Sequence, residues 1–227
     1  MQIVEIYKSL QGESSYAGLP CVFVRTAGCN LRCVWCDSEY TFKSGQKMTL
    51  EEVEREVLRL SPDGGLVEIT GGEPLLQEAA VVALMEKLLV HGYTVLIETS
   101  GERLLNKVPE QVIKIVDVKC PDSGEGETFR LENLEHLTKR DEVKLVLASR
   151  KDYEFARDFI REYDLSGKVA SVILSPAFRK DAIGARDSSH CLLDPRDLAE
   201  WMLADGLNAR LGLQIHKFIW EPSMKGV

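Results

Sequence analysis

Three cysteines in one short loop are the residues of this chain best placed to do chemistry. Cys29, Cys33 and Cys36 follow the spacing C-x3-C-x2-C within the run GCNLRCVWCD. Thiolates bind zinc and iron–sulfur clusters, and a closed site of either kind usually takes four protein ligands. Three ligands leave one coordination position open, so the loop at residues 28–38 predicts a metal centre that can also bind a small molecule.

The rest of the chain indicates which metal centre this is. A tetrahedral zinc site needs a fourth ligand, but the nearest histidine is His91 and no second cysteine or histidine pair follows at zinc-site spacing. A [4Fe-4S] cluster can bind three cysteines and leave its fourth iron to a ligand. A disulfide pair or three unrelated core cysteines are the alternatives. Six cysteines in 227 residues, with three clustered, favour metal binding in a reducing compartment. Cys21, Cys120 and Cys191 are assigned no chemistry.

Composition limits the class of protein. The chain is 44% hydrophobic over 227 residues, which suits one domain spanning residues 1–227. Its formal net charge is -8, which does not suit nucleic-acid binding. We see neither a signal peptide nor an apolar run near the roughly 18 residues of a membrane span. We therefore expect a cytoplasmic protein without a membrane or nucleic-acid partner.

Strand patterns alternate with helical patterns along the chain. Strands are expected at 2–7, 21–26, 66–70, 93–99, 112–119, 143–148, 169–174 and 211–216, and helices at 50–60, 77–90, 128–140, 151–163 and 194–205. This alternation predicts an α/β fold of mostly parallel strands, in the form of an open, partial β/α barrel. The segments 121–127 and 176–190 look irregular, and loops of that length often form lids or partner surfaces.

A second motif, TGGEP at residues 70–74, directly follows an expected strand. In a β/α barrel, functional residues lie where strands end, and the cysteine loop also follows a strand. Gly71 and Gly72 would let a ligand approach the backbone closely, and Glu73 offers a carboxylate to a cationic amine. A tight turn between a strand and a helix is the alternative interpretation of this motif.

The cysteine loop resembles that of the radical S-adenosylmethionine (SAM) superfamily, since an aromatic residue, Trp35, precedes its third cysteine. Further motifs resemble those of the 7-carboxy-7-deazaguanine synthases of the queuosine and deazapurine pathway. These are LQGE at 10–13, Arg25 four residues before the first cysteine, the run Cys36-Asp37-Ser38, TGGEPLLQ at 70–77, and the late motif Q-x-HK at 214–217. The resemblance covers most of the chain.

The resemblance implies a lyase that converts 6-carboxy-5,6,7,8-tetrahydropterin to 7-carboxy-7-deazaguanine with release of ammonia. Its implied cofactors are one [4Fe-4S] cluster on Cys29, Cys33 and Cys36, SAM and Mg²⁺, with Ser38 as the Mg²⁺ ligand. Hydrogen abstraction by a 5′-deoxyadenosyl radical would start the reaction, so no side chain is assigned a certain catalytic role. Flavodoxin or ferredoxin as external reductant and a homodimer are further expectations.

Residues for the two ligands also follow from the resemblance. For the pterin these are Leu10, Gln11, Gly12, Glu13, Arg25, Thr70, Gln214, His216 and Pro222. For SAM they are Trp35, Cys36, Asp37, Gly72, Glu73, Ser100, Lys119, Leu174, Ser175, Pro176 and Ala177. Arg25 would pair with the substrate carboxylate through its planar guanidinium. We expect the C-terminal segment, residues 207–227, to close the substrate site.

One departure and three alternative functions stay open. In some relatives the chain ends at a proline whose terminal carboxylate enters the site, whereas here Ser223 to Val227 follow Pro222. The first alternative is a radical SAM activating enzyme, which would place a glycyl radical on a partner protein. A non-catalytic iron–sulfur electron carrier and a zinc-binding structural module are the others.

Overall fold

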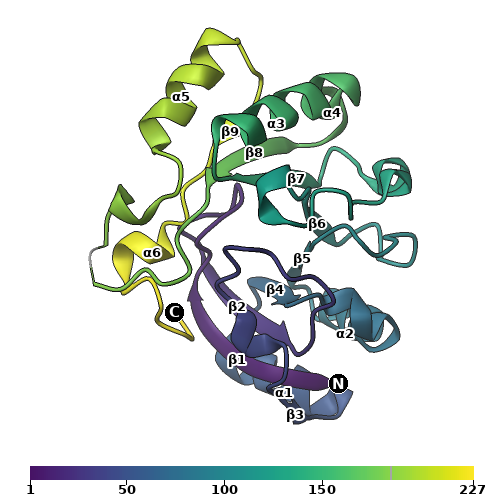
Figure 1. Cartoon of the computed structure of the whole chain (residues 1–227). Helices are drawn as coiled ribbons and strands as arrows, with labels where there is room; N and C mark the ends of the chain where they lie inside the picture. The colour runs from purple at the N-terminus through teal and green to yellow at the C-terminus, as the bar shows by residue number, and fades with distance from the viewer. Residues whose placement is uncertain (185) are drawn as a thin grey trace.

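A nine-stranded sheet forms the centre of the molecule, for which a computed structural model describes residues 1–184 and 186–227. The strand order is β3-β1-β2-β4-β5-β6-β7-β8-β9 (Figure 1). The strands are β1 (Gln2–Leu10), β2 (Pro20–Thr26), β3 (Gln46–Lys47), β4 (Leu66–Gly71), β5 (Thr94–Thr99), β6 (Ile113–Asp117), β7 (Glu142–Leu147), β8 (Ser171–Pro176) and β9 (Arg210–Leu211). Neighbouring strands from β2 to β9 are parallel, while β1 is antiparallel to both β2 and β3.

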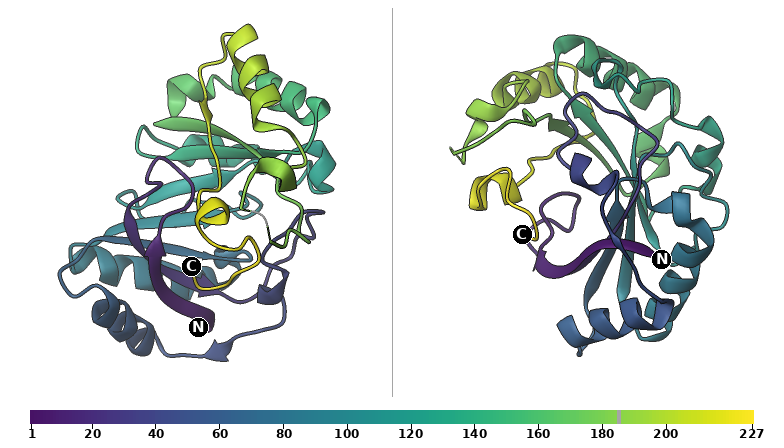
Figure 2. Two further views of the ribbon diagram at one scale, coloured as in Figure 1. Left: turned by 90° about the vertical axis from the view of Figure 1, so that its left-hand side faces the viewer. Right: turned by 60° about the horizontal axis from the view of Figure 1, so that its bottom comes forward.

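Helices cover the outer face of this curved sheet (Figure 2). The α-helices are α1 (Leu50–Leu60), α2 (Glu78–Val90), α3 (Arg150–Glu162), α4 (Leu165–Lys168), α5 (Pro195–Ala204) and α6 (His216–Ile219). Short 3-10 helices are η1 (Glu39–Thr41), η2 (Pro74–Gln77), η3 (Pro121–Ser123), η4 (Leu131–His136) and η5 (Ser188–His190). The predicted α/β class and open, mostly parallel barrel are confirmed.

Alternation along each strand gives the sheet two different faces. On β4, Val67 and Ile69 point outward into the core shared with α1 and α2. Glu68 and Thr70, the residues between and after them, line an inner cavity. The helices therefore pack on an apolar surface, and the inner face is free to carry polar side chains.

The two ends of the chain meet across the open side of the barrel. The backbone N–H of Ile215 donates a hydrogen bond to the carbonyl of Gly12 at 2.9 Å. A Cβ atom on Gly12 would lie 2.1 Å from Nδ1 of His216, so this close approach requires glycine. Figures 1 and 2 both show the C-terminal segment, in yellow, beside the first loop, which is the connection between β1 and β2 at residues 11–19.

The helix predicted at 128–140 is wrong, because only η4 forms there. The buried side chain of Asn133 accepts from the N–H of Leu105 and donates to the carbonyls of Gly101 and Arg103. The carboxylate of Asp141 accepts from the N–H and hydroxyl of Thr138. These side-chain bonds hold the segment against its neighbours in turns and replace a continuous helical ladder.

The last predicted strand, 211–216, is also wrong in extent. Only Arg210–Leu211 pairs with β8, and a Cβ atom on Gly212 would lie 2.5 Å from the side chain of Ile173. Beyond Gly212 the chain leaves the sheet to reach the first loop, so Gln214 and His216 lie in a loop and a short helix. Strand β8 extends to Pro176, two residues further than expected. Residue 185, within the predicted irregular segment 176–190, lies outside the described residues.

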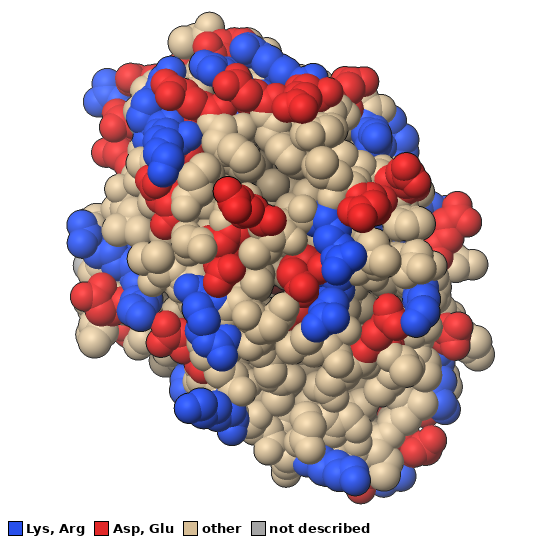
Figure 3. Space-filling view, turned by 45° about the vertical axis from the view of Figure 1, so that its right-hand side comes forward, with Lys and Arg blue, Asp and Glu red and all other residues tan. Residues whose placement is uncertain are grey.

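The surface and helices add two observations about partners. Acidic and basic side chains are interspersed on the face shown in Figure 3. In the part of the chain that the structure describes, every helix is too short or too polar to cross a lipid bilayer.

Candidate active site

A cavity opens at the carboxyl ends of the parallel strands. Its walls are the inner face of the sheet, the cysteine loop, the first loop and the C-terminal segment. Most of the predicted site residues line it: Leu10, Gln11, Gly12, Glu13, Arg25, Cys29, Cys33, Trp35, Cys36, Asp37, Ser38, Thr70, Gly72, Ser100, Lys119, Gln214, His216 and Pro222. Glu73, Leu174, Ser175, Pro176 and Ala177 do not.

The cysteine loop meets the requirements for holding a cluster. All six cysteines are free, so the structure does not support the disulfide alternative, and the three cysteines of the loop line one cavity. The N–H of Cys36 bonds to the carbonyl of Cys33 at 3.2 Å, which turns the loop. Within the described residues, no three His, Cys, Asp or Glu side chains already stand at metal-binding distances. Binding a cluster therefore requires the thiols to draw together and to lose their protons.

The turn formed by Gly71, Gly72 and Glu73, called the GGE turn below, packs against the cysteine loop. A Cβ atom on Gly72 would lie 2.5 Å from both the Cβ of Cys29 and the carbonyl oxygen of Gly28. The N–H of Glu73 donates to the same carbonyl at 2.9 Å. The two motifs picked out from the sequence are thus in direct contact.

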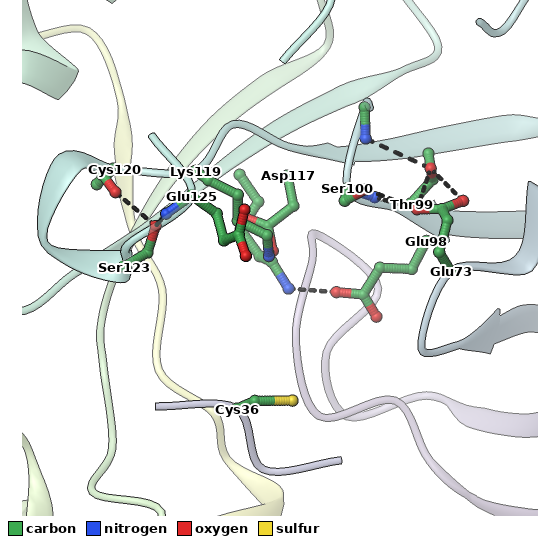
Figure 4. Close-up of polar contacts among 12 residues, drawn as sticks. Cys36, Glu73, Glu98, Thr99, Ser100, Asp117, Lys119, Cys120, Ser123 and Glu125 are labelled. Atoms are coloured by element: carbon green, nitrogen blue, oxygen red, sulfur yellow. Dashed lines mark hydrogen bonds and ion pairs between the residues drawn. The ribbon is translucent and has the colours of Figure 1, made fainter. Parts of the chain in front are cut away.

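The carboxylate of Glu73 is fully buried and already occupied. It accepts hydrogen bonds from the N–H of Leu75, the hydroxyl of Thr99, and the N–H and hydroxyl of Ser100. Figure 4 shows this group, with Cys36 on a separate loop. In this structure Glu73 ties the turn to the end of β5. Its predicted contact with a cofactor amine stays a prediction.

Lys144 lies at the centre of a buried ion network. Its ammonium donates to Glu13 at 2.8 Å and to Glu98, and its side chain is 4% exposed. The other oxygen of Glu13 accepts from Gln214 at 2.7 Å. Burial alone would raise the pKa of Glu13, but Lys144, His216 and these hydrogen bonds outweigh it and lower the pKa to about 2. Glu13 is therefore an ionised acceptor inside the cavity.

Glu68 is the opposite case, a cavity carboxyl without an ion-pair partner among the described residues. It accepts a hydrogen bond from Gln11 and is 2% exposed. Burial raises its pKa well above the usual value, and repulsion from Glu98 and Glu13 raises this pKa further. The cations Lys144 and Arg25 lower it, but by less. Gln11 in turn accepts from the N–H of Glu13 at 2.8 Å, so these groups hold the first loop in place.

Arg25 points into the cavity from β2, but it is not a free cation. Its Nε donates to Glu5 at 2.7 Å and its terminal nitrogen to the hydroxyl of Tyr7 at 2.9 Å. The hydroxyl of Tyr40 donates to the same Glu5 oxygen at 2.8 Å. The remaining N–H groups of the guanidinium can still bind a carboxylate.

The C-terminal segment adds a second ion pair and a histidine. Lys217, which is 5% exposed, donates to Asp37 at 2.6 Å and to Gln214 at 2.9 Å. Burial, with help from the nearby cations Lys217 and Lys144, lowers the pKa of His216 against the pull of Glu13 and Asp37. The imidazole is therefore neutral at neutral pH.

Several cavity residues had not been picked out from the sequence. Among them are Tyr7, Tyr40, Glu68, Asp117 and Lys144. Glu98 was noted only as part of a strand end, Lys217 only as the lysine of the Q-x-HK motif, and the tail at 223–227 only as part of the segment 207–227. A usable signal existed for Glu68, Glu98, Asp117 and Lys144, because each is a charged residue inside an apolar strand, where only an interior site can accommodate it. Lys217 and the tail carry no such signal.

Comparison with known proteins agrees with this geometry. A profile of the radical SAM superfamily matches residues 23–123. The 7-carboxy-7-deazaguanine synthase of Koribacter versatilis is 67% identical over 227 residues, covering 100% of both chains. That of Chlorobaculum tepidum is 41% identical and covers 100% of this chain and 97% of its own. The chain belongs to the 7-carboxy-7-deazaguanine synthase family.

Solved structures support the fold of this family. The crystal structure of QueE from Escherichia coli has a TM-score of 0.67 at 23% identity, covering 93% of this chain and 92% of that one. A radical SAM methyltransferase from Sphaerobacter thermophilus has a TM-score of 0.58 at 17% identity, covering 88% and 68%. The activating-enzyme, electron-carrier and zinc-module alternatives are not favoured, since the full-length relatives are synthases by name.

Proposed function

We propose that this chain converts 6-carboxy-5,6,7,8-tetrahydropterin to 7-carboxy-7-deazaguanine and ammonia. The observation that carries the proposal is that the cysteine loop and the polar residues Gln11, Glu13 and Arg25 line a single cavity. A radical generated at the loop would therefore form next to groups suited to a guanine-like ring with a carboxylate.

The residues present fit the cofactors of the family. Cys29, Cys33 and Cys36 would hold a [4Fe-4S] cluster with one open iron for SAM. Together these groups supply, when bound, the 5′-deoxyadenosyl radical that abstracts a substrate hydrogen. The chain itself binds and orients the ligands and excludes water. Trp35, Asp37, Gly72, Ser100 and Lys119 face the cavity and are the SAM contacts supported by geometry.

The substrate contacts follow from the charge state of each group. Glu13, ionised and aimed by Lys144 and Gln214, accepts hydrogen bonds from the amino and ring N–H groups of the pterin. Arg25 binds the carboxylate through the edge not used by Glu5. Neutral His216 can donate or accept one hydrogen bond at the ring.

Leu10, Gly12, Thr70, Gln214 and Pro222 complete the proposed pterin site, since all of them line the cavity. Ser38 is the proposed ligand of Mg²⁺, and its hydroxyl makes no capping bond to η1. Support is weaker for Leu174, Ser175, Pro176 and Ala177, whose side chains are buried in or just after β8.

Partners and compartment are part of the same proposal. Free cysteines suit a reducing cytoplasm, and the family suggests a homodimer with flavodoxin or ferredoxin as reductant. The bond from Ile215 to Gly12 and the contact of Gln214 with Glu13 support a C-terminal segment, residues 207–227, that closes the substrate site.

An anaerobic turnover assay tests the function. Reconstituted protein is given 6-carboxy-5,6,7,8-tetrahydropterin, SAM and a reductant, with and without Mg²⁺, and the products are identified by mass spectrometry. We expect 7-carboxy-7-deazaguanine and 5′-deoxyadenosine from the wild type. Cys33→Ala should lose both cluster absorbance and product, because two cysteines cannot hold the cluster.

Cys191→Ala is the matched control, since Cys191 is a free cysteine outside the cavity. It should keep cluster absorbance and turnover. Intact cluster binding in the wild type without any conversion of the pterin would refute the proposed substrate, while conversion by Cys33→Ala would refute the role of the loop.

A further inference from the structure

The cations of the cavity are almost all neutralised by carboxylates. Five lysine or arginine side chains line it. Four of them form ion pairs, namely Arg25–Glu5, Lys119–Asp117, Lys144–Glu13 and Lys217–Asp37. The fifth, Lys225, makes no ion pair with any residue that the structure describes. Among the residues that the structure describes, it is the one cavity cation whose charge is not already matched.

Lys225 lies where a substrate carboxylate is expected. Its ammonium sits 4.2 Å from the centre of the Tyr40 ring, and the guanidinium of Arg25 lies over the same ring at 6.0 Å. The tail from Pro222 onward, which lines the cavity, carries Lys225 there. An ammonium has three N–H donors, so one that contacts a ring face still has donors for an anion.

The charge of Arg25 is already matched before any substrate binds. Glu5 forms an ion pair with Arg25 at 2.7 Å, so the two side chains together carry no net charge. A carboxylate bound to this pair would add a negative charge in a cavity where Glu13 and Glu98 already share a single ammonium, that of Lys144. Nearby like charges raise the free energy of such a complex unless another cation is present.

We propose that Lys225 supplies the positive charge that balances the substrate carboxylate, while Arg25 orients that carboxylate. This inference rests on the proposed function and adds a binding residue to it. It also gives the five residues after Pro222 a role, namely to bring this ammonium to the cavity mouth.

Equilibrium binding to the anaerobic, reconstituted enzyme with SAM tests the proposal. The probes are 6-carboxypterin and pterin, which lacks the carboxylate, and quenching of their fluorescence reports binding. Lys225→Gln should weaken binding of 6-carboxypterin by roughly fivefold to tenfold at low salt, as expected for an exposed charge-assisted contact. Binding of pterin should not change. Raising the salt concentration should narrow the difference between wild type and variant, because exposed charges are screened.

Two further variants separate charge from shape. Lys225→Arg should restore binding of 6-carboxypterin. Lys43→Gln removes an exposed charge outside the cavity and should bind both probes as the wild type does. Unchanged affinity of Lys225→Gln for 6-carboxypterin, or an equal loss for both probes, would overturn the proposal. A wild type that binds neither probe and converts no tetrahydropterin would instead count against the proposed function.

Discussion

At the scale of single residues, Lys144 explains how two partly buried carboxylates can lie close together in the cavity. Its ammonium contacts Glu13 and Glu98 from the middle of β7. Burying a charge is costly unless it is paired, so removing the shared partner leaves two carboxylates uncompensated. Lys144 therefore affects both the stability of the fold and the orientation of Glu13.

Lys144→Met should lower the free energy of unfolding by about 1–3 kcal/mol, because the two carboxylates lose their cation but are partly exposed to solvent. Urea denaturation of the cluster-free protein measures it. Lys151→Met is the control, because Lys151 pairs with Asp122 while 68% exposed, and it should have little effect. Equal midpoints for the two variants would show that Lys144 does not hold the network.

Glu68 should make stability depend on pH in the opposite sense to an ordinary carboxylate. Burial, and then repulsion from Glu98, raise its pKa in the folded state. Between the unfolded pKa, about 4.3, and the higher folded pKa, the folded state binds more protons. The contribution of Glu68 to the free energy of unfolding is therefore fully present below its unfolded-state pKa and is lost as the pH rises through its folded-state pKa.

Glu68→Gln removes this titration and keeps an amide of the same shape. From pH 5 to pH 8 the variant should therefore lose less unfolding free energy than the wild type. Urea denaturation at intervals across this range measures the slope. Glu51→Gln, at an exposed site on α1, should follow the wild-type curve. Parallel curves for all three proteins would contradict a raised pKa at Glu68.

The sequence allowed some of these residues to be predicted and not others. Glu13 and Arg25 belong to motifs, LQGE and the arginine before the cysteine loop, so their place was expected. The partners that set their charge state, Lys144 and Glu5, come from other strands and could be assigned only once strand order and register were known. Lys114 shows the limit of the strand signal, because this charged strand residue is also buried but pairs with Asp141 outside the cavity.

At the scale of elements, the parallel strands were predictable because buried strands read as short apolar runs. Helix 128–140 was not, since a buried side-chain network around Asn133 replaced helical hydrogen bonds, and periodicity does not report such competition. From the sequence, the GGE turn and the cysteine loop could be expected only to lie near each other, because each follows a strand of the barrel. The tightness of their contact at Gly72 is visible only in three dimensions.

Gly72→Ala tests this contact. The added methyl group would meet the Gly28 carbonyl and Cys29 at 2.5 Å, and backbone cannot move aside as a side chain can. We expect a loss of roughly 1–3 kcal/mol in stability, typical of overpacking, and a lower iron content per chain after reconstitution. Urea denaturation and iron analysis measure these. Lys43→Ala, an exposed change just beyond the loop, is the control. Wild-type values for both quantities would mean that the turn does not brace the loop.

At the scale of the whole molecule, the cavity is assembled from both ends of the sequence. β1 and the first loop supply Tyr7, Gln11 and Glu13, while the C-terminal segment supplies Gln214 and Lys217. The open barrel was predictable from the alternation of elements, and the C-terminal segment 207–227 was expected to close the substrate site. The individual contacts of that segment with the first loop and the cysteine loop were not predictable. These contacts include the backbone hydrogen bond from Ile215 to Gly12, the bonds from Gln214 to Glu13 and from Lys217 to Asp37, and the close approach of Gly12 to His216.

The contacts of residues 214–217 with the cavity can form only late in protein synthesis. Residue 215 leaves the ribosome only after every strand of the sheet, so a nascent chain carries the cysteine loop long before the wall opposite it. A growing polypeptide thus lacks a closed chamber in which a reactive radical could be shielded. Shielding of the cysteine loop from solvent by the C-terminal segment is accordingly available only to chains whose translation has passed the last described strand.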